Sequence, residues 1–361
     1  MTDKTQFNLR VHYPVESGRL TVRTDQNWNR AVEAVAVSPD RQTWTFELLL
    51  DRPYIYYKPC LEMAHSVAWS RGNNYLAIPV RSARRPEAPA LGCARETVVE
   101  VDVYPHFHGK VGGTIGKLIE VPAANGVCSH LIRCYYPPGY HQNPLQRFPV
   151  LYMHDGNNLF FPGEAFLGSD WQVEQTMDML DAMNIIRPCI VVGVYPRTRE
   201  VEYTAPGYHE YGRFLIDEIK HKTVDQQIRT MPGPSSTAVM GSSLGGVVSL
   251  FMAWEWPETV GMAACMSSTF TWRDNLMERI AREPRRSVRL YLDSGWPGDN
   301  YEVTRSMRDL LLHKGYQYGR DLLYFAFPEA LHDERHWAMR SHIPFQFFFG
   351  DTYLHAPPAS P

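Results

Sequence analysis

Apolar and polar positions alternate in short runs along the first part of the chain. Residues 7–13 read FNLRVHY and residues 43–50 read TWTFELLL, so apolar side chains recur at every second position in both. An alternation of period two indicates strands with one buried face. Similar short runs, separated by turn-rich stretches, lie at 20–23 and 54–57. Because no long helical pattern occurs here, residues 1–95 are predicted to form a small β-sandwich domain.

A polar segment rich in Pro and Arg at 82–89 resembles a linker, and the pattern changes after it. Continuous apolar runs at 149–154 and 189–194 are typical of strands buried on both faces of a parallel sheet. They alternate with segments of helical spacing, which predicts an α/β domain over 96–361 with helices on both faces of the sheet. Strands are predicted at 97–103, 131–136, 149–154, 189–194, 237–240, 288–293 and 322–327, and helices at 171–183, 211–221, 244–254, 303–314 and 335–349.

Length, charge and cysteine usage narrow the class of protein. The chain has 361 residues, which is long for a single core, and its formal net charge is −3. No basic stripe indicates a nucleic-acid partner, and no apolar run is long enough to span a membrane. The first residues lack the pattern of a signal peptide, and none of the six cysteines forms a C-x-x-C pair. We therefore expect a cytoplasmic protein with free thiols.

One short motif carries candidate chemistry. Residues 241–245 read GSSLG and match G-x-S-x-G, the nucleophile elbow of α/β-hydrolases. The predicted strand at 237–240 precedes it and the predicted helix at 244–254 follows it, which is the context that the motif requires. A chain that turns this sharply leaves no room for side chains two positions before and after the serine. The pattern therefore predicts Ser243 as a nucleophile within an α/β-hydrolase fold.

The neighbouring residues supply a rival and the candidate oxyanion donors. Ser242 fits the motif badly, because Met240 stands where a glycine is needed. The N–H of Leu244 at the start of the helix is a candidate donor to an oxyanion. The second donor is expected from the loop after the strand at 149–154, where Gly156 and Asn157 allow a close backbone approach.

A serine of this class needs a histidine beyond the last strand and an acid after the strand before it. His332 follows the predicted strand at 322–327 and is the favoured base, with His336 as the alternative. Asp299 lies in the loop after the preceding strand, where it could orient the histidine ring, whereas Asp293 lies at the strand end. We favour Asp299 as the acid and keep Asp293 as the alternative. A Ser–His dyad is the third option.

These residues together resemble a known family. Residues 150–160, 240–246 and 332–340 are similar to the esterases of the enterochelin-esterase and esterase D type, over roughly 111–350. The resemblance implies an α/β-hydrolase fold with Ser243 as nucleophile, His332 as base and an acid near Asp299. Family members cleave esters of siderophores, feruloylated sugars and glutathione thioesters, so the resemblance implies the reaction and not the substrate.

The resemblance also suggests pocket residues and a type of N-terminal module. Trp171 and Tyr203 are candidate walls of the substrate pocket on the family pattern, with packing in the core as an equal alternative. Apart from the resemblance, Arg197 and Arg199 are candidates for lining the site and attracting a carboxylate, although such residues are more often solvated loop charges. The N-terminal part is similar to the immunoglobulin-like early-set or starch-binding-like modules found ahead of such esterases. Tryptophans in such a module can stack on sugars, but filling the sandwich core is the preferred interpretation for Trp28, Trp44 and Trp69.

The sequence therefore predicts a serine carboxylic-ester hydrolase that works through a Ser-His-Asp triad and an acyl-enzyme. No cofactor and no metal are expected, and the substrate is expected to be a small-molecule or carbohydrate-linked ester. Two alternatives stay open: a carbohydrate-binding or scaffold protein built on an inactive hydrolase fold, and an acyltransferase. The oligomeric state also stays open, a homodimer included.

Overall fold

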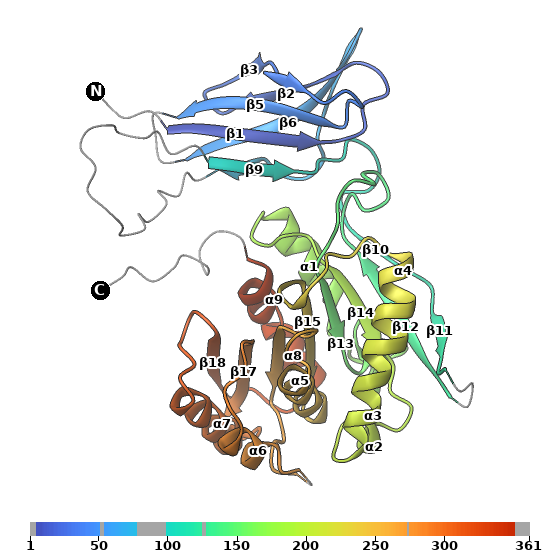
Figure 1. The fold of residues 1–361 in the computed structure, drawn as a ribbon, viewed down its shortest axis with the longest axis vertical. Coiled ribbons are helices and arrows are strands. Elements are labelled where there is room, and N and C mark those ends of the chain that lie inside the picture. The colour runs from blue at the N-terminus through green and yellow to red at the C-terminus, as the bar shows by residue number, and fades with distance from the viewer. Residues whose placement is uncertain (1–4, 51–53, 78–98, 125–127, 273, 351–361) are drawn as a thin grey trace, which may run out of the picture.

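The computed structural model describes residues 5–50, 54–77, 99–124, 128–272 and 274–350, and Figure 1 shows their arrangement. The strands are β1 (Thr5–His12), β2 (Arg19–Thr24), β3 (Asn27–Val32), β4 (Ala36–Val37), β5 (Thr43–Leu50), β6 (Ile55–Met63), β7 (Ser66–Trp69), β8 (Tyr75–Ala77), β9 (Val99–Val103), β10 (Thr114–Ile115), β11 (Ile119–Pro122), β12 (Ser129–Tyr136), β13 (Val150–Met153), β14 (Ile190–Val194), β15 (Thr237–Ser242), β16 (Met262–Met266), β17 (Arg289–Trp296) and β18 (Leu322–Pro328). The α-helices are α1 (Val173–Ala182), α2 (Arg199–Glu202), α3 (Gly207–Phe214), α4 (Asp225–Gln227), α5 (Leu244–Glu255), α6 (Leu276–Arg282), α7 (Tyr301–His313), α8 (Glu334–Arg340) and α9 (His342–Phe349). Short 3-10 helices are η1 (Gly156–Asn158), η2 (Phe166–Gly168) and η4 (Pro234–Ser236), and η3 (Leu215–Val224) is a π-helix.

The N-terminal part contains two sheets, with strand orders β4-β5-β1-β9 and β3-β2-β6-β7, and β8 pairs with β6 (Figure 1). The predicted alternation is observed in β5, where Trp44, Phe46 and Leu48 are buried and Glu47 is exposed. These side chains join a core cluster with apolar residues of the other sheet. Strand β9 runs parallel to β1, so the sheet extends beyond residue 95, where we expected the division into domains. That division stays a prediction, and the expected linker at 82–89 lies outside the described residues.

A nine-stranded sheet forms the rest of the fold, with the order β10-β12-β14-β13-β15-β16-β17-β18 and β11 paired to β12. The strands from β14 to β18 along this order are parallel, and β12 is antiparallel to β14. Every residue of β13, β14 and β16 is buried, as expected for strands covered on both faces. Helices flank the sheet, so the predicted α/β class is confirmed.

Several elements differ from the prediction, among them β16 and the last predicted helix. Strand β16 was not predicted, because its five residues, MAACM, are too few to show a clear period. The helix expected at 335–349 is two helices, α8 and α9, which meet at Ser341. Pro344 has no N–H to donate to the carbonyl four residues earlier, so it cannot continue the hydrogen bonding of α8.

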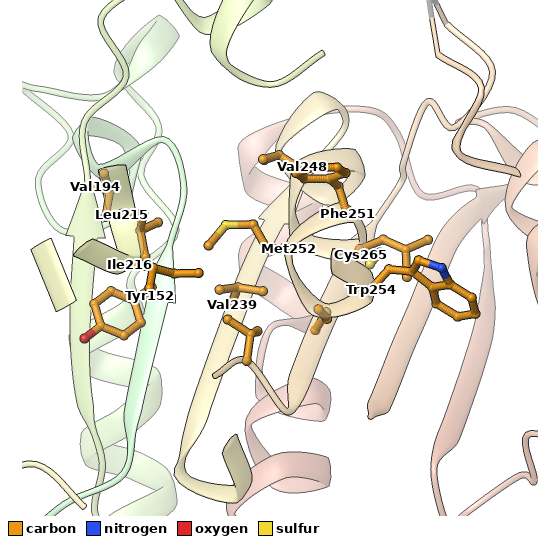
Figure 2. Close-up of a cluster of buried hydrophobic side chains, with 14 of the residues drawn as sticks. Tyr152, Val194, Leu215, Ile216, Val239, Val248, Phe251, Met252, Trp254 and Cys265 are labelled. Carbon is orange, nitrogen blue, oxygen red and sulfur yellow. The ribbon is translucent and has the colours of Figure 1, made fainter. Parts of the chain in front are cut away.

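Helix α5 lies at the centre of the largest buried cluster. All of its residues from Leu244 to Trp254 are buried, which is the behaviour of a helix that is apolar on every side. Figure 2 shows its side chains beside those of the sheet and of η3. A fully buried side chain of the size of Phe251 stabilises the fold by about 1.5–3 kcal/mol. The turn between β15 and α5 is therefore anchored at both ends in the rigid core.

Side-chain hydrogen bonds connect the N-terminal part to the nine-stranded sheet and its helices. The buried Asn143 donates from Nδ2 to the carbonyl oxygens of His12 (2.8 Å) and Pro105 (2.9 Å). Asn184 Nδ2 donates to the carbonyl oxygen of Asn74 (2.5 Å). Within the described ranges, no helix is both long enough and apolar enough to cross a membrane.

Candidate active site

Ser243 stands at the turn between β15 and α5 with φ 56° and ψ −118°, a conformation that non-glycine residues rarely adopt. Its backbone N–H donates to the carbonyl oxygen of Met266 (2.8 Å), which ties the turn to the end of β16. A Cβ added at Gly241 would lie 2.7 Å from the carbonyl carbon of Gly245. A Cβ at Gly246 would lie 1.9 Å from Ser268 Oγ. Close packing therefore requires glycine at 241 and leaves little room at 246, whereas a Cβ at Gly245 would have its nearest neighbour, Asp155 Oδ2, at an ordinary contact distance of 3.4 Å.

His332 and Asp299 lie on the loops that follow β18 and β17, and they are hydrogen bonded. The distance from His332 Nδ1 to Asp299 Oδ1 is 2.6 Å. Burial alone would raise the pKa of Asp299, but hydrogen bonds from His332, Ser267 and the Gly295 N–H outweigh it. The pKa of Asp299 is consequently lower than usual, so the group is a carboxylate at neutral pH. The structure brings together the two residues that the sequence analysis favoured.

The alternative acid, Asp293, is fully buried behind this pair. Tyr291 Oη donates to its Oδ2 (2.7 Å), and Arg340 Nε lies 3.2 Å from the same oxygen. Burial raises the pKa of Asp293 to about 6 in spite of the neighbouring Arg340. The alternative base, His336, is paired with Asp333, with Nδ1 and Oδ1 2.8 Å apart. Neither alternative is in hydrogen-bond contact with the favoured pair among the described residues.

The expected oxyanion loop directly follows β13. Asp155 has a left-handed backbone (φ 55°, ψ 49°), and the 3-10 helix η1 begins at Gly156. A Cβ on Gly156 would lie 2.7 Å from the carbonyl carbon of Gly193 and equally close to the Tyr195 ring, so only glycine fits. The N–H groups at the starts of η1 and α5 have no partner within their own helices, which leaves them suited to bind an anion. The starts of these helices are Gly156 and Leu244.

Arg199, which the sequence analysis named with Arg197 as a residue that could line the site, holds this loop. Its Nε and Nη2 donate to Asp155 Oδ1 (2.8 Å) and Oδ2 (2.9 Å). Nη2 also donates to the Ser242 carbonyl oxygen (3.3 Å), so the guanidinium joins the loop to the elbow. On the other side, Asn158 Nδ2 donates to Glu334 Oε1 (3.3 Å) near the start of α8. The loop after β13 is therefore connected both to the turn that carries Ser243 and to the start of α8, which follows His332.

Two of the three expected pocket residues are buried. Tyr203 is 0% exposed, and its hydroxyl accepts a hydrogen bond from the Asp155 N–H (3.1 Å). Trp171 is 3% exposed and packs against Trp337, with ring centroids 5.8 Å apart. Packing in the core was the alternative held equal to a pocket wall, and a role in the substrate pocket stays a prediction for both rings. Arg197 is exposed, and its backbone N–H donates to Glu202 Oε2 (3.0 Å).

Sequence reasoning also missed Ser267 and Arg340, which both contact Asp299. Ser267 Oγ lies 2.6 Å from Asp299 Oδ2, and Arg340 Nη2 lies 3.3 Å from the same oxygen. A serine at the end of an unpredicted strand and an arginine inside a helix carry no distinctive local signal. Their role depends on contacts with residues distant in the chain. Among the described residues, no group of three or more His, Cys, Asp or Glu side chains is placed to hold a metal ion.

Comparisons with known proteins identify the family of the chain. A family model described as "Putative esterase" matches residues 127–337, which is more than half of the chain. The "Uncharacterized protein YbbA" of Bacillus subtilis (strain 168) is 25% identical over 180 residues, which cover 46% of this chain. The match spans 65% of that relative, slightly less than two thirds of its length.

Solved structures with low sequence identity share the fold. A ferulic acid esterase superposes with a TM-score of 0.55 at 15% identity, over 66% of this chain and 98% of that one. The enterobactin esterase FES from Shigella flexneri superposes with a TM-score of 0.54 at 13% identity, over 94% of this chain and 92% of that one. The second match also includes most of the N-terminal part. The chain therefore belongs to the esterase family that the matching model describes, and it has the α/β-hydrolase fold.

Proposed function

We propose that this protein hydrolyses carboxylic esters through an acyl-enzyme on Ser243, with His332 as general base and Asp299 as the acid that orients it. The observation that carries the proposal is the 2.6 Å hydrogen bond between His332 Nδ1 and Asp299 Oδ1. Strands β15, β17 and β18 are parallel, so the loops after them meet at one edge of the sheet. Topology thus supplies an oriented imidazole at the edge where the elbow serine stands.

The ionised Asp299 selects the tautomer of the neutral His332 imidazole. A carboxylate only accepts hydrogen bonds, so His332 keeps its proton on Nδ1 and presents Nε2 as an acceptor. Ser243 Oγ attacks the acyl carbon of the ester as its proton moves to His332 Nε2. The carbonyl π electrons move to the oxygen and form the oxyanion. No hydrogen bond joins Ser243 to His332 among the described residues, and such contacts often tighten only when substrate is bound.

The oxyanion is stabilised by backbone donors. Candidates are the N–H of Leu244 and those of Gly156 and Asn157. Removal of one such donor from an enzyme lowers kcat by a factor of about 10²–10³. When the oxyanion collapses, the C–O bond breaks and the leaving alkoxide takes the proton from His332 Nε2. A water then gives a proton to Nε2 as its oxygen attacks the acyl carbon. The second collapse releases the acid, and the proton returns to Ser243 Oγ.

The structural neighbours suggest the first substrates to test. Their printed names are ferulic acid esterase and enterobactin esterase, and esters of these two kinds extend the proposal to a substrate class. Transfer of the acyl group to an alcohol would use the same acyl-enzyme. The five described cysteines are free thiols, which supports a cytoplasmic location as a further part of the proposal.

The test compares Ser243→Ala with Ser242→Ala, a matched control at the adjacent rival serine. Hydrolysis of p-nitrophenyl acetate and covalent labelling by a fluorophosphonate probe are measured for both, with circular dichroism to confirm folding. Ser243→Ala should lose labelling and at least about a thousandfold in kcat. Ser242→Ala should keep both. Retained turnover in a folded Ser243→Ala variant would refute the proposal.

A further inference from the structure

Ser267 occupies the point where three parts of the site meet. It is the residue after β16, it is fully buried, and its φ is 46°. Its N–H donates to the Asp293 carbonyl oxygen (2.8 Å), and its own carbonyl oxygen accepts from Asn300 Nδ2 (2.7 Å). The preceding carbonyl, that of Met266, accepts from the Ser243 N–H (2.8 Å). The backbone here is therefore bonded both to the elbow and to the loop that carries Asp299.

The Ser267 hydroxyl uses its full hydrogen-bonding capacity. It lies 2.6 Å from Asp299 Oδ2, 2.9 Å from Trp337 Nε1 and 2.5 Å from Arg340 Nη2. Tryptophan and arginine nitrogens only donate, so both must give hydrogen bonds to the Ser267 oxygen. The single hydroxyl proton is then directed to the Asp299 carboxylate. The three partners therefore allow only one orientation of the Ser267 hydroxyl proton.

Each partner of the hydroxyl acts on the acid–base pair. Asp299 uses its other oxygen, Oδ1, to bind His332 Nδ1. The Trp337 ring stands edge-on to the His332 ring, with centroids 4.9 Å apart and an interplanar angle of 82°. Arg340 lies between the carboxylates of Asp293 and Asp299. The hydroxyl thus holds the acid from one side and the ring that supports the base from the other.

We propose that Ser267 is a positioning residue, whose hydroxyl holds Asp299 and Trp337 together so that the His332 imidazole keeps the orientation needed to accept the Ser243 proton. The inference rests on the proposed function, since it concerns the same acid–base pair. Ser267 is not a catalytic residue, because its hydroxyl is saturated by protein groups and is buried. Its effect on the reaction is exerted through Asp299 and Trp337.

Ser268 provides a matched control. It is also fully buried at the end of β16, and its Oγ has no hydrogen-bond partner in the described part of the chain. Ser267→Ala and Ser268→Ala therefore each remove one buried hydroxyl from adjacent positions. Only the first removal takes a hydrogen bond from the acid. Ser267→Gly is a second variant that suits the left-handed backbone and serves if the alanine variant does not fold.

The experiment measures kcat and KM for p-nitrophenyl acetate in the full-length chain, together with the far-downfield proton resonance of His332 Nδ1–H. Loss of a hydrogen bond to the charged Asp299 weakens the support of the acid. We therefore expect Ser267→Ala or Ser267→Gly to lower kcat about 10- to 100-fold and to leave KM within about twofold of that of the parent protein. The resonance should shift or broaden in the Ser267 variants. Ser268→Ala should leave kcat, KM and the resonance close to those of the parent protein.

The outcomes separate this inference from the proposed function. A Ser267 variant with the kcat and proton resonance of Ser268→Ala would overturn the positioning role. A loss confined to KM would also overturn it, because orientation of the base affects the chemical step. If Ser243→Ala is inactive while Ser267→Ala is unchanged, only the positioning role fails. If Ser243→Ala retains turnover, the proposed function itself fails.

Discussion

Replacing Asp299 by asparagine tests the proposed acid, because the side chain keeps nearly the same shape while it loses its charge. The side-chain atoms of Asp299 face different partners. Oδ2 accepts from Ser267 Oγ (2.6 Å), the Gly295 N–H (2.7 Å) and Arg340 Nη2 (3.3 Å), and Oδ1 faces His332 Nδ1 at 2.6 Å. An asparagine must put its carbonyl oxygen toward the three donors, since an NH₂ group there would meet only donors. Its NH₂ group must then face His332.

The orientation of the asparagine amide determines how far kcat falls. An NH₂ group facing Nδ1 makes that nitrogen an acceptor, so the proton moves to Nε2, which can no longer accept the proton of Ser243. In serine proteases the equivalent change lowers kcat by about 10⁴, and four factors of ten correspond to about 5 kcal/mol. We expect a loss of this order for Asp299→Asn. Asp299→Ala removes the orienting hydrogen bond without imposing the wrong tautomer, and we expect a smaller loss.

The assay is kcat for p-nitrophenyl acetate, with active-site titration to count functional sites and thermal unfolding to confirm the fold. Asp299→Asn should remain folded, because it keeps acceptors for Ser267 and Gly295. A kcat within about tenfold of the parent protein would refute the assignment of Asp299, since one factor of ten is only about 1.4 kcal/mol. An asparagine variant that is more active than the alanine variant would refute the tautomer argument.

Two further changes test the loop and a buried histidine. Gly156→Ala should lower kcat and destabilise the fold by about 1–3 kcal/mol, because the added Cβ meets the backbone at Gly193; a fully active variant in the same hydrolysis assay would contradict the close approach. Burial lowers the pKa of His154 to about 3, below its usual value near 6.5, with a smaller contribution from Arg199. The unfolded chain therefore binds a proton more readily, and the free energy of unfolding should fall as pH decreases from about 6.5 toward 3, by about 1.4 kcal/mol per pH unit from this group. His154→Phe should flatten that slope in denaturant titrations, and an unchanged slope would show that His154 is not buried in its neutral form.

Local patterns predicted most of the elements, for identifiable reasons. The strand expected at 43–50 coincides with β5, because a strand with one buried face has a period that neighbouring residues reveal. The helix expected at 244–254 differs from α5 by a single residue at its end. The favoured partners of the elbow serine, His332 and Asp299, were placed by chain order relative to strands. That rule works because parallel strands bring their carboxyl ends to one edge.

The residues that were missed, or left between two interpretations, depend on contacts across the fold. The sequence left Tyr203 and Trp171 between a pocket wall and core packing, and the structure shows that both side chains are buried. Arg340 was not singled out, because its position between Asp293 and Asp299 follows from contacts of α8 with β17 and with the loop after it. No periodicity within one segment carries such information.

The sequence by itself determined the class of fold and the elbow at Ser243, because hydrophobic period and the glycines of a sharp turn are local properties. It also favoured Asp299 as the acid, but it left open Asp293 and a Ser–His dyad. Only the tertiary structure paired Asp299 with His332 and placed Asp293 in the core behind them. It alone showed that Ser267 joins the loop of Asp299 to α8, because hydrogen bonds between residues far apart in the chain are formed by strand order and helix packing.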